Sequence, residues 1–276
     1  MSAGVLALVL LAALLHAAWN ALVKAGEDPF VRLAVVNLTI ALLALPFALA
    51  LSPPPGAAWP WLLASVAAHT VYYVTLARGY AEGDLSQVYP IARGLAPPLV
   101  ALFALVIAGE RPSLVGMIGI LLVGAGVVAL ALDGPATRRP RAVASAVLCA
   151  VAIALYTVFD GLGVRASPHP GSYIAWLFLL EPFVFAAWVF ARRGFGIGAR
   201  GLRAAALGGL LSGIAYALVI FAMSLAPMAY VSALRETSVV MAAAIGVWLL
   251  RETMGVRRIL SAALVAAGIL LVRIGG

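Results

Sequence analysis

Charged residues are scarce in this sequence of 276 residues: Asp, Glu, Lys and Arg make up 10% of it, while hydrophobic residues make up 65%. Soluble domains are on average about 25% charged and about 45–50% apolar. A soluble domain of this length could not bury so much apolar surface, and the mean hydropathy of +1.12 agrees. The composition therefore excludes a water-soluble protein and predicts an all-α polytopic membrane protein that lies in a lipid bilayer.

The groups that catalytic and metal sites require are also scarce. Cys149 is the only cysteine, so no disulfide can form within the chain. The three histidines, His16, His69 and His169, fall in separate segments, and no Cys/His cluster has the spacing of metal ligands. The sequence also has no glycine-rich phosphate loop and no G-x-S-x-G motif. It thus predicts no catalytic residue, no metal and no cofactor, and we do not expect an enzyme.

Basic residues are few and lie between the apolar runs. No Lys or Arg precedes the run from Gly4 to Ala18, so this run lacks the positive region of a signal peptide and we expect a retained helix. The net charge of +8 comes from short clusters such as Arg192-Arg193. Such clusters favour loops that face the cytoplasm and anionic lipid, and no nucleic-acid partner is expected.

Ten apolar runs are each long enough to cross the hydrocarbon core, which takes about 20 helical residues. Residues that form turns separate them. The expected spans are 3–23, 31–51, 60–80, 87–108 and 113–132, followed by 143–163, 171–191, 204–225, 229–249 and 256–273.

The sequence contains an internal repeat. Arg93 and Glu110 recur 142 residues later as Arg235 and Glu252, and each pair brackets an apolar span. Because each half has five spans, an odd number, tandem halves insert with opposite orientation, and we expect ten transmembrane helices as two inverted five-helix repeats. The two halves are residues 1–136 and 137–276. Inverted repeats are typical of secondary transporters, which bind their substrate between the repeats.

The two sets of loops differ in positive charge. The loops after the first, third, fifth, seventh and ninth spans carry thirteen Lys and Arg residues, Arg32 among them, whereas the opposite side, with both termini, carries three. Because positively charged loops stay in the cytoplasm, this count predicts both termini outside the cell.

Four charged residues stand out inside the expected spans: Arg93, Glu181, Arg235 and Glu236. Each costs about 2.5–3.5 kcal/mol at the centre of a bilayer unless it is paired or lines a cavity. Two alternatives follow. The two glutamates neutralise the two arginines, or the arginines converge on a cavity and bind a carboxylate or phosphate of the substrate, for which a guanidinium is well shaped.

Polar and aromatic side chains add to these charges. Tyr89 lies one helical turn from Arg93, and Ser238 lies on the same stripe as Arg235. We predict that the substrate is bound by Arg93, Arg235, Tyr89, Trp19, Asn20, His69, Tyr73, Tyr216 and Ser238. Further polar groups, each more typical of an interhelical hydrogen bond, are His16, Asn37, Tyr72, Tyr156, Asp160 and Ser212.

Glu181 and Glu236 are candidates for proton coupling or charge balance. Glu181 lies near the middle of its span, and burial favours the protonated form of a carboxyl, as a coupling residue requires. Glu236 is about 100° around the helix from Arg235, so we expect it to meet a neighbouring helix. We therefore favour Glu181 for coupling.

Glu110 and Glu252 follow the ends of their spans. We expect structural roles, in which each carboxylate caps the start of the next helix or pairs with a nearby arginine.

Several of these residues carry a resemblance to a known family. They are Tyr89-Pro-Ile-Ala-Arg-Gly94 followed by Pro97 and Gly109-Glu-Arg111, and Ala233-Leu-Arg-Glu-Thr-Ser238 followed by Leu250-Arg-Glu252. The sequence resembles the drug/metabolite transporter superfamily, in particular its EamA-type members. The resemblance covers the whole chain.

The resemblance implies a secondary transporter and an exporter of a small polar metabolite, in a bacterial inner (plasma) membrane. The proton is a candidate coupling ion because of Glu181, and the resemblance leaves the energy source open. Relatives move amino acids, amines, sugar phosphates, nucleotide sugars and drugs, and phosphate-translocating relatives have basic residues that match Arg93 and Arg235. Relatives of ten spans generally keep both termini in the cytoplasm, opposite to the charge count. The alternative functions are an integral-membrane enzyme or a channel, and the chain acts as a monomer or a homodimer.

Overall fold

The computed structural model describes residues 1–23, 28–82, 85–130, 140–241 and 255–276, which contain helices and no β-strand. The all-helical class is thereby confirmed for the described residues. In chain order the helices are α1 (Ala3–Val23), α2 (Pro29–Ala50), α3 (Trp59–Glu82), α4 (Leu85–Ala108), α5 (Leu114–Leu130), α6 (Pro140–Arg165), α7 (Pro170–Leu180), α8 (Pro182–Arg193), α9 (Ala199–Met223), α10 (Met228–Arg235) and α12 (Val256–Gly275).

Five helical segments of the described chain are long and apolar enough to cross a membrane. They are Phe30–Ala50, Gln87–Ala108, Pro140–Arg165, Pro170–Arg193 and Ala199–Met223. Apolar side chains on their outer faces are exposed, for example Leu49 (78%) and Val106 (74%), which suits contact with lipid. Arg32, which we expected in a loop, lies instead within α2 and is 6% exposed.

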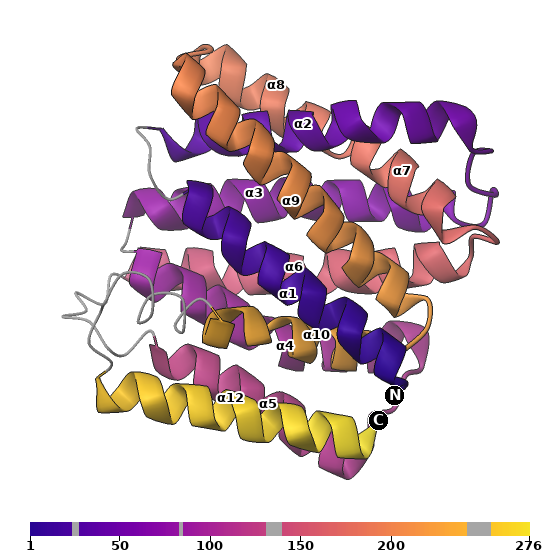
Figure 1. The fold of residues 1–276 in the computed structure, drawn as a ribbon, viewed down its shortest axis with the longest axis vertical. Helices are drawn as coiled ribbons and strands as arrows, with labels where there is room; N and C mark the ends of the chain where they lie inside the picture. Colours follow the sequence, from indigo (N-terminus) through magenta and orange to yellow (C-terminus); the bar gives the residue numbers. More distant parts are fainter. Residues whose placement is uncertain (24–27, 83–84, 131–139, 242–254) are drawn as a thin grey trace.

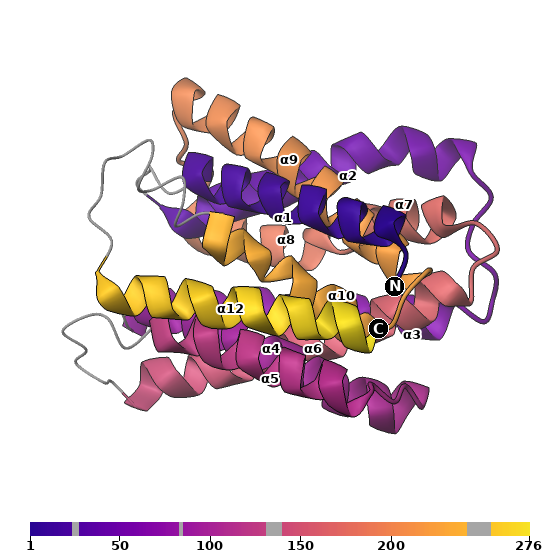
Figure 2. The ribbon, with the colours of Figure 1, turned by 60° about the horizontal axis from the view of Figure 1, so that its bottom comes forward.

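The first helices of the two halves run in opposite directions (Figure 1). The chain enters α1 from the end at which both termini lie, whereas it enters α6 from the opposite end. Helices at equivalent positions of the two halves pack on each other: α2 contacts α7 and α8, α4 contacts α10, and α5 contacts α12. The last pair lies side by side in Figure 1 and in Figure 2. This self-pairing is what an inverted duplication produces, because its symmetry axis passes between equivalent helices.

Both termini lie at one end of the bundle, where the amino group of Met1 donates a hydrogen bond to the carbonyl of Gly276 (2.6 Å). The links 51–58, 109–113, 166–169 and 224–227 lie at this end, which we call the termini end (Figure 1). The link 194–198 lies at the opposite end. We call this the basic end, because Arg192 and Arg193 lie in the last turn of α8, directly before the link. These links lie at the ends that the expected order of spans assigns to them.

Two of the expected spans are interrupted at their glutamates. The span expected at 171–191 forms α7 and α8, which meet at Glu181, because Pro182 has no N–H to continue the helical pattern. In the span expected at 229–249, α10 ends at Arg235 and residues 237–241 are helical again. Both expected spans are helical in the described residues, with a local break at or next to the glutamate. Discontinuous helices of this kind flank the binding sites of secondary transporters.

The break after α10 has a local cause in its hydrogen bonds. The N–H of Glu236 donates to Ala233, three residues back, and the N–H of Val239 donates to Glu236 in the same way (3.1 and 3.0 Å). A tighter turn with i→i−3 bonds therefore replaces the α-helical pattern at this point. The turn lets Arg235 and Glu236 leave the helix in different directions.

Candidate functional site

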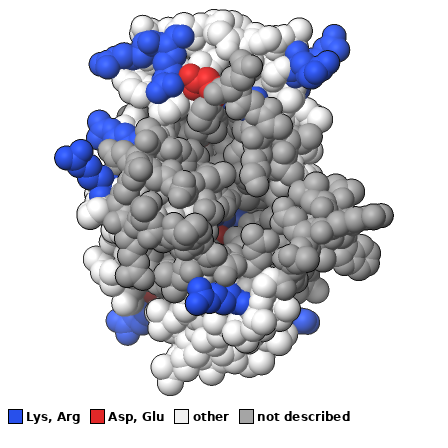
Figure 3. All heavy atoms as spheres, turned by 90° about the vertical axis from the view of Figure 1, so that its left-hand side faces the viewer, with Lys and Arg blue, Asp and Glu red and all other residues white. Residues whose placement is uncertain are grey.

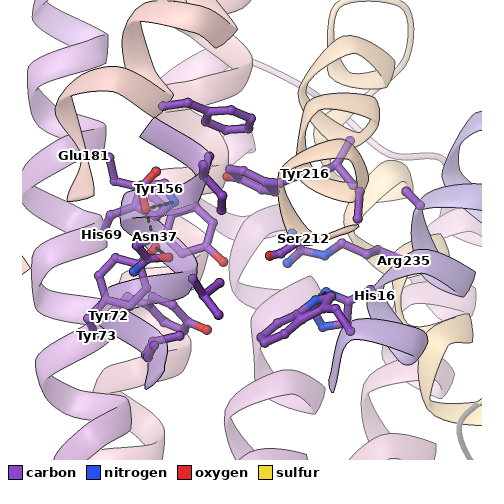
Figure 4. Close-up of a pocket in the computed structure, with 18 of the residues that line it drawn as sticks. His16, Asn37, His69, Tyr72, Tyr73, Tyr156, Glu181, Ser212, Tyr216 and Arg235 are labelled. Carbon is purple, nitrogen blue, oxygen red and sulfur yellow. Dashed lines mark hydrogen bonds and ion pairs between the residues drawn. The ribbon is translucent and has the colours of Figure 1, made fainter. Parts of the chain in front are cut away.

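A cavity lies between the two halves, near the two helix breaks (Figure 4). Its free space is about 80 Å³, where a single water needs roughly 10–15 Å³. The lining side chains come from eight helices and are Ala12, His16, Trp19, Leu33, Val36, Asn37, Ile40, His69, Tyr72, Tyr73, Arg93, Tyr156, Phe178, Ser212, Ala215, Tyr216, Val219 and Arg235, with Glu181 at the α7–α8 junction. Both arginines that we expected to converge on one cavity therefore line it.

The cavity lies near the middle of the bundle. Its residues from α1 and α2 lie toward the basic end of those helices, whereas its residues from α9, such as Tyr216 and Val219, belong to the later part of a helix that begins at the basic end. Figure 3 looks onto the basic end and shows a hollow near its centre, in which blue and red side-chain atoms are visible.

Arg93 forms an ion pair with Glu236 across the two halves. Its Nη2 lies 2.7 Å from Oε1 of Glu236, and its Nε donates a hydrogen bond to Oε2 (3.1 Å). Both side chains are buried, and Glu236 is fully enclosed. The expected internal pairing is correct for these two residues, and Glu236 meets a neighbouring helix as we expected. The charge of Arg93 is therefore balanced within the protein.

Arg235 has no such partner. The residue is 4% exposed, and its Nε and Nη2 are buried without a hydrogen-bond acceptor in the described part of the chain. In the same part, no carboxylate lies within 4 Å of its guanidinium group. Its neighbours are Tyr156, which forms a side-chain hydrogen bond with it, and the ring of Tyr216, whose centroid is 6.0 Å from Cζ. The alternative in which the two glutamates neutralise both arginines is therefore wrong for Arg235, and a buried cation faces the cavity.

Glu181 lies on the opposite side of the cavity from Arg235 (Figure 4). The hydroxyl of Tyr73 donates a hydrogen bond to its Oε1, and Nε2 of His69 lies 4.0 Å from the same oxygen. Nδ1 of His69 lies 3.0 Å from the backbone carbonyl and 3.1 Å from the hydroxyl of Ser65. No Lys or Arg among the described residues pairs with Glu181.

Asp160 is a buried acid that the sequence analysis did not count among the charges. It is fully enclosed in α6, and its carboxylate accepts hydrogen bonds from the hydroxyls of Tyr173 (3.0 Å) and Tyr216 (2.5 Å). Its position inside an apolar helix is the feature of the sequence that could have identified it. Asp160 does not line the cavity, but it holds the hydroxyl of Tyr216, whose side chain does.

The other expected binding residues divide into three groups. Trp19, His69, Tyr73 and Tyr216 line the cavity. Tyr89 lies behind it, with its hydroxyl 3.2 Å from Nε2 of His16. Ser238 is buried outside the lining, and the side chain of Asn20 is outside the described part of the structure. The further polar groups His16, Asn37, Tyr72, Tyr156 and Ser212, which we had not put among the binding residues, also line the cavity.

Glu110 links the two halves at the termini end. Its carboxylate pairs with Arg165 (Nη1–Oε1, 2.7 Å) and accepts a hydrogen bond from the backbone N–H of Met228 (2.9 Å). Arg165 in turn donates to the carbonyls of Met223 and Ala226 (2.8 Å each). The carboxylate therefore caps α10 and not the next helix, α5. The arginine that it pairs with, Arg165, belongs to the second half. Glu252 lies outside the described residues.

Within the described residues, no group of three or more His, Cys, Asp and Glu side chains could hold a metal ion. Two similar helical halves with a charged cavity between them, built on interrupted helices, define the class of membrane transporters.

The chain belongs to the EamA-like transporter family, which is part of the drug/metabolite transporter superfamily. The family model matches twice, at residues 3–132 and 140–274. The predicted division at 136/137 falls between these matches, among residues that the structure does not describe. A solved structure described as "Crystal structure of protein" has a TM-score of 0.80 and 19% identity, over 99% of this chain and 98% of that one, and shares the fold. The comparison with curated proteins gives no match.

Proposed function

We propose that the protein is a secondary active transporter that exports a small polar metabolite through alternating access around the central cavity. Its ten transmembrane helices form two inverted five-helix repeats in a bacterial inner membrane. The observation that carries this proposal is Arg235, a buried arginine with two unpartnered nitrogen atoms in a cavity between two repeats. A buried cation without a partner is costly in the protein alone, and a bound anionic group removes that cost.

The anionic group on the substrate is a carboxylate or a phosphate, because a guanidinium binds both with two parallel hydrogen bonds. Arg93 contributes less to substrate binding than the sequence indicated, because its guanidinium group already pairs with Glu236. The cavity of about 80 Å³ supports a small substrate.

Export, and not uptake, is the direction that the resemblance to EamA-type members favours. The positive-inside rule places the end of the bundle with most of the basic loops in the cytoplasm, so an exporter takes up its substrate from that end.

The proposal is tested with purified protein reconstituted into vesicles. A thermal-shift screen of small carboxylates and phosphates identifies ligands, because a ligand that binds only the folded state raises its stability. We expect saturable exchange of such a ligand in wild-type vesicles and in Arg193→Gln vesicles, which lack an exposed arginine outside the cavity. Arg235→Gln should lose about tenfold or more in affinity, since hydrogen bonds to a charged group contribute about 1.5–3 kcal/mol. Non-saturable flux would indicate a channel, and chemical conversion of the ligand an enzyme.

Glu181 is the residue that we propose for proton coupling. In Glu181→Gln, which keeps the shape of the side chain but cannot titrate, transport driven by a pH gradient should be lost. Exchange of substrate for substrate, measured at saturating concentration, should persist. If Glu181→Gln vesicles still concentrate substrate under an imposed pH difference, Glu181 is not the coupling residue.

A further inference from the structure

A connected series of polar side chains leads from the cavity into the protein. Glu181 lines the cavity, and its Oε1 lies 4.0 Å from Nε2 of His69 (Figure 4). Nδ1 of His69 lies 3.1 Å from the hydroxyl oxygen of Ser65, and this hydroxyl is hydrogen-bonded to the carboxyl group of Asp160. Asp160 itself is fully enclosed and does not line the cavity. His69 therefore lies between two acids, one that faces the cavity and one that does not.

Neither of these acids has a cationic partner. In the described part of the chain, no Lys or Arg forms an ion pair with Glu181 or with Asp160, although both are buried. Two buried carboxylates without a counter-charge are costly, because the interior does not replace the water that each one loses. A bound proton removes one of the two charges, and the imidazole of His69 is a base that contacts this set. The set therefore favours at least one bound proton.

Tyrosine hydroxyls donate hydrogen bonds to both acids without supplying a positive charge. Tyr73 donates to Glu181, and Tyr173 and Tyr216 donate to Asp160. The other titratable and charged groups in or next to the cavity lining are His16 of α1, Arg32 of α2, Tyr72 of α3, Tyr89 and Arg93 of α4, Tyr156 of α6, Arg235 of α10, and Glu236 directly after α10. Arg93 is neutralised by Glu236, and Arg235 lies across the cavity from Glu181 (Figure 4). These arginines therefore do not pair with the two acids.

The hydroxyl of Ser65 can connect His69 and Asp160 in either direction, because a hydroxyl both donates and accepts a hydrogen bond. When Nδ1 of His69 carries a hydrogen, it donates to Ser65, and Ser65 donates to the carboxylate of Asp160. When Asp160 is protonated, it donates to Ser65, and Ser65 donates to Nδ1. The change from the first arrangement to the second moves one proton from His69 to Asp160, and no heavy atom has to leave its place.

We propose that Glu181 and Asp160 hold a proton in turn, and that His69 and Ser65 pass it between them. The proton of Glu181 goes to Nε2 of His69, while the proton on Nδ1 goes through Ser65 to Asp160, so the number of protons is conserved. This step requires Glu181 and His69 to approach from 4.0 Å to hydrogen-bond distance, about 2.7–3.2 Å. The hydroxyl of Tyr73 can then turn to its second acceptor, Oδ1 of Asn37 (3.3 Å).

This inference rests on the proposed transport function, in which Glu181 carries the coupling proton. It adds a second proton site, Asp160, that lies outside the cavity and is not touched by a substrate bound there. While Asp160 holds the proton, Glu181 can be ionised in the cavity without releasing the proton to the water there. Asp160 is in this way a proton store and not only an anchor for the hydroxyl of Tyr216.

Infrared spectroscopy of the purified full-length protein tests the shared proton without any substrate. The carbonyl stretch of a protonated carboxyl group disappears on ionisation, so a pH titration follows both buried acids. An isotope label on the carboxyl carbon of aspartate separates Asp160, the one buried aspartate of the described residues, from Glu181. In Glu181→Gln we expect the midpoint of the Asp160 band to move by about one pH unit or more, as for strongly interacting groups. Asp28→Asn, which removes a partly exposed acid at the basic end, should leave this midpoint unchanged.

A pH jump followed by time-resolved infrared spectroscopy tests the passage through Ser65. Ser65→Ala keeps both acids and the imidazole but removes the connecting hydroxyl. Protonation of Asp160 should then slow by about 100-fold, the lower end of what a positioned proton donor contributes. Thr70→Val is the matched control, because it removes a hydroxyl of the same helix that bonds to the backbone carbonyl of Val66 (3.0 Å), and it should keep the wild-type rate.

Three results would overturn the proton store. The midpoint of the Asp160 band could stay the same in Glu181→Gln, Asp160 could stay ionised at every pH at which the protein is folded, or Ser65→Ala could protonate Asp160 at the wild-type rate. The second result would leave Asp160 as an anchor for Tyr216 alone. Failure of the transport proposal is recognised separately: vesicles that exchange none of the ligands found in the thermal-shift screen contradict transport, whereas the infrared measurements need no ligand.

Discussion

At the scale of single residues, the two arginines that the repeat makes equivalent have different roles. Glu236 neutralises Arg93 at 2.7 Å, whereas Arg235 keeps two buried nitrogen atoms without a partner. The duplicated sequence predicts equal roles because the arginines occupy matching positions. Glu236 breaks this equivalence, since the matching position of the first half is Gly94.

Substitution of one residue of the Arg93–Glu236 pair should strongly destabilise the protein. Glu236→Gln leaves a buried cation uncompensated and should lower the free energy of unfolding by about 3–5 kcal/mol. The double variant Arg93→Gln/Glu236→Gln should recover part of this loss, because neither charge is then left alone. Thermal unfolding of the purified variants measures both effects. Arg193→Gln, which breaks an exposed ion pair with Asp28, should cost no more than about 1 kcal/mol. A larger loss in the double variant than in Glu236→Gln would contradict the pairing.

At the scale of helices, close contacts between equivalent elements hold the halves together. A Cβ atom added to Gly119 of α5 would lie 2.6 Å from the backbone oxygen of Gly268 in α12, and one added to Gly268 would lie 2.7 Å from that of Gly119. A backbone atom cannot move aside as the end of a flexible side chain can. These two glycines therefore determine how near α5 and α12 approach.

Gly119→Ala should force α5 and α12 apart. We expect a loss of about 1–3 kcal/mol in stability, the usual cost of overpacking. The melting temperature in detergent is the measurement. Gly196→Ala is a matched control, because an added Cβ there meets nothing within 4 Å. Equal melting temperatures for the two variants would show that the α5–α12 contact tolerates separation.

At the scale of the whole molecule, the two ends of the bundle differ. Glu110, Arg165 and the backbone of α9 and α10 are bonded together at the termini end, and none of these groups lines the cavity. This set of bonds joins the end of α4 in the first half to three helices of the second half. It is suited to hold the termini end closed.

Arg165→Gln should weaken this closure. Loss of about 1 kcal/mol of ion-pair and hydrogen-bond energy would raise the fraction of molecules open at the termini end about fivefold. Spin labels on cysteines placed at Arg111 and Leu225, both exposed residues of this end, report the change as a longer inter-label distance in a Cys149→Ala background. Arg193→Gln with the same labels is the control. An unchanged distance distribution in Arg165→Gln would mean that other contacts keep this end closed.

Orientation in the membrane is a further property of the whole molecule. Thirteen basic residues against three predict that Gly276 lies outside the cytoplasm. In bacterial cells, a fluorescent protein that matures only in the cytoplasm should stay dark when it is fused to Gly276. Alkaline phosphatase, which is active only outside, should be active at the same position. The reverse pair of results would favour the orientation of the characterised relatives.

The sequence by itself determined the membrane class, the helices and the division into two related halves. These properties depend on local composition and on duplication, and both can be read along the chain. Pro182 also marks the break at Glu181, because the lack of an N–H is a local property. The equivalence of Arg93 and Arg235 was likewise visible, and both line the same cavity.

Only the tertiary structure decided which charges are paired and which remain for a ligand. Glu236 meets Arg93 across 143 residues, Tyr73 meets Glu181 across 108, and Tyr216 meets Asp160 across 56. Four arginine–glutamate pairings were open between two arginines and two glutamates, and periodicity gives no preference among them. The choice depends on how the helices of the two halves approach each other, because an ion pair in a low-dielectric interior forms only between groups in contact.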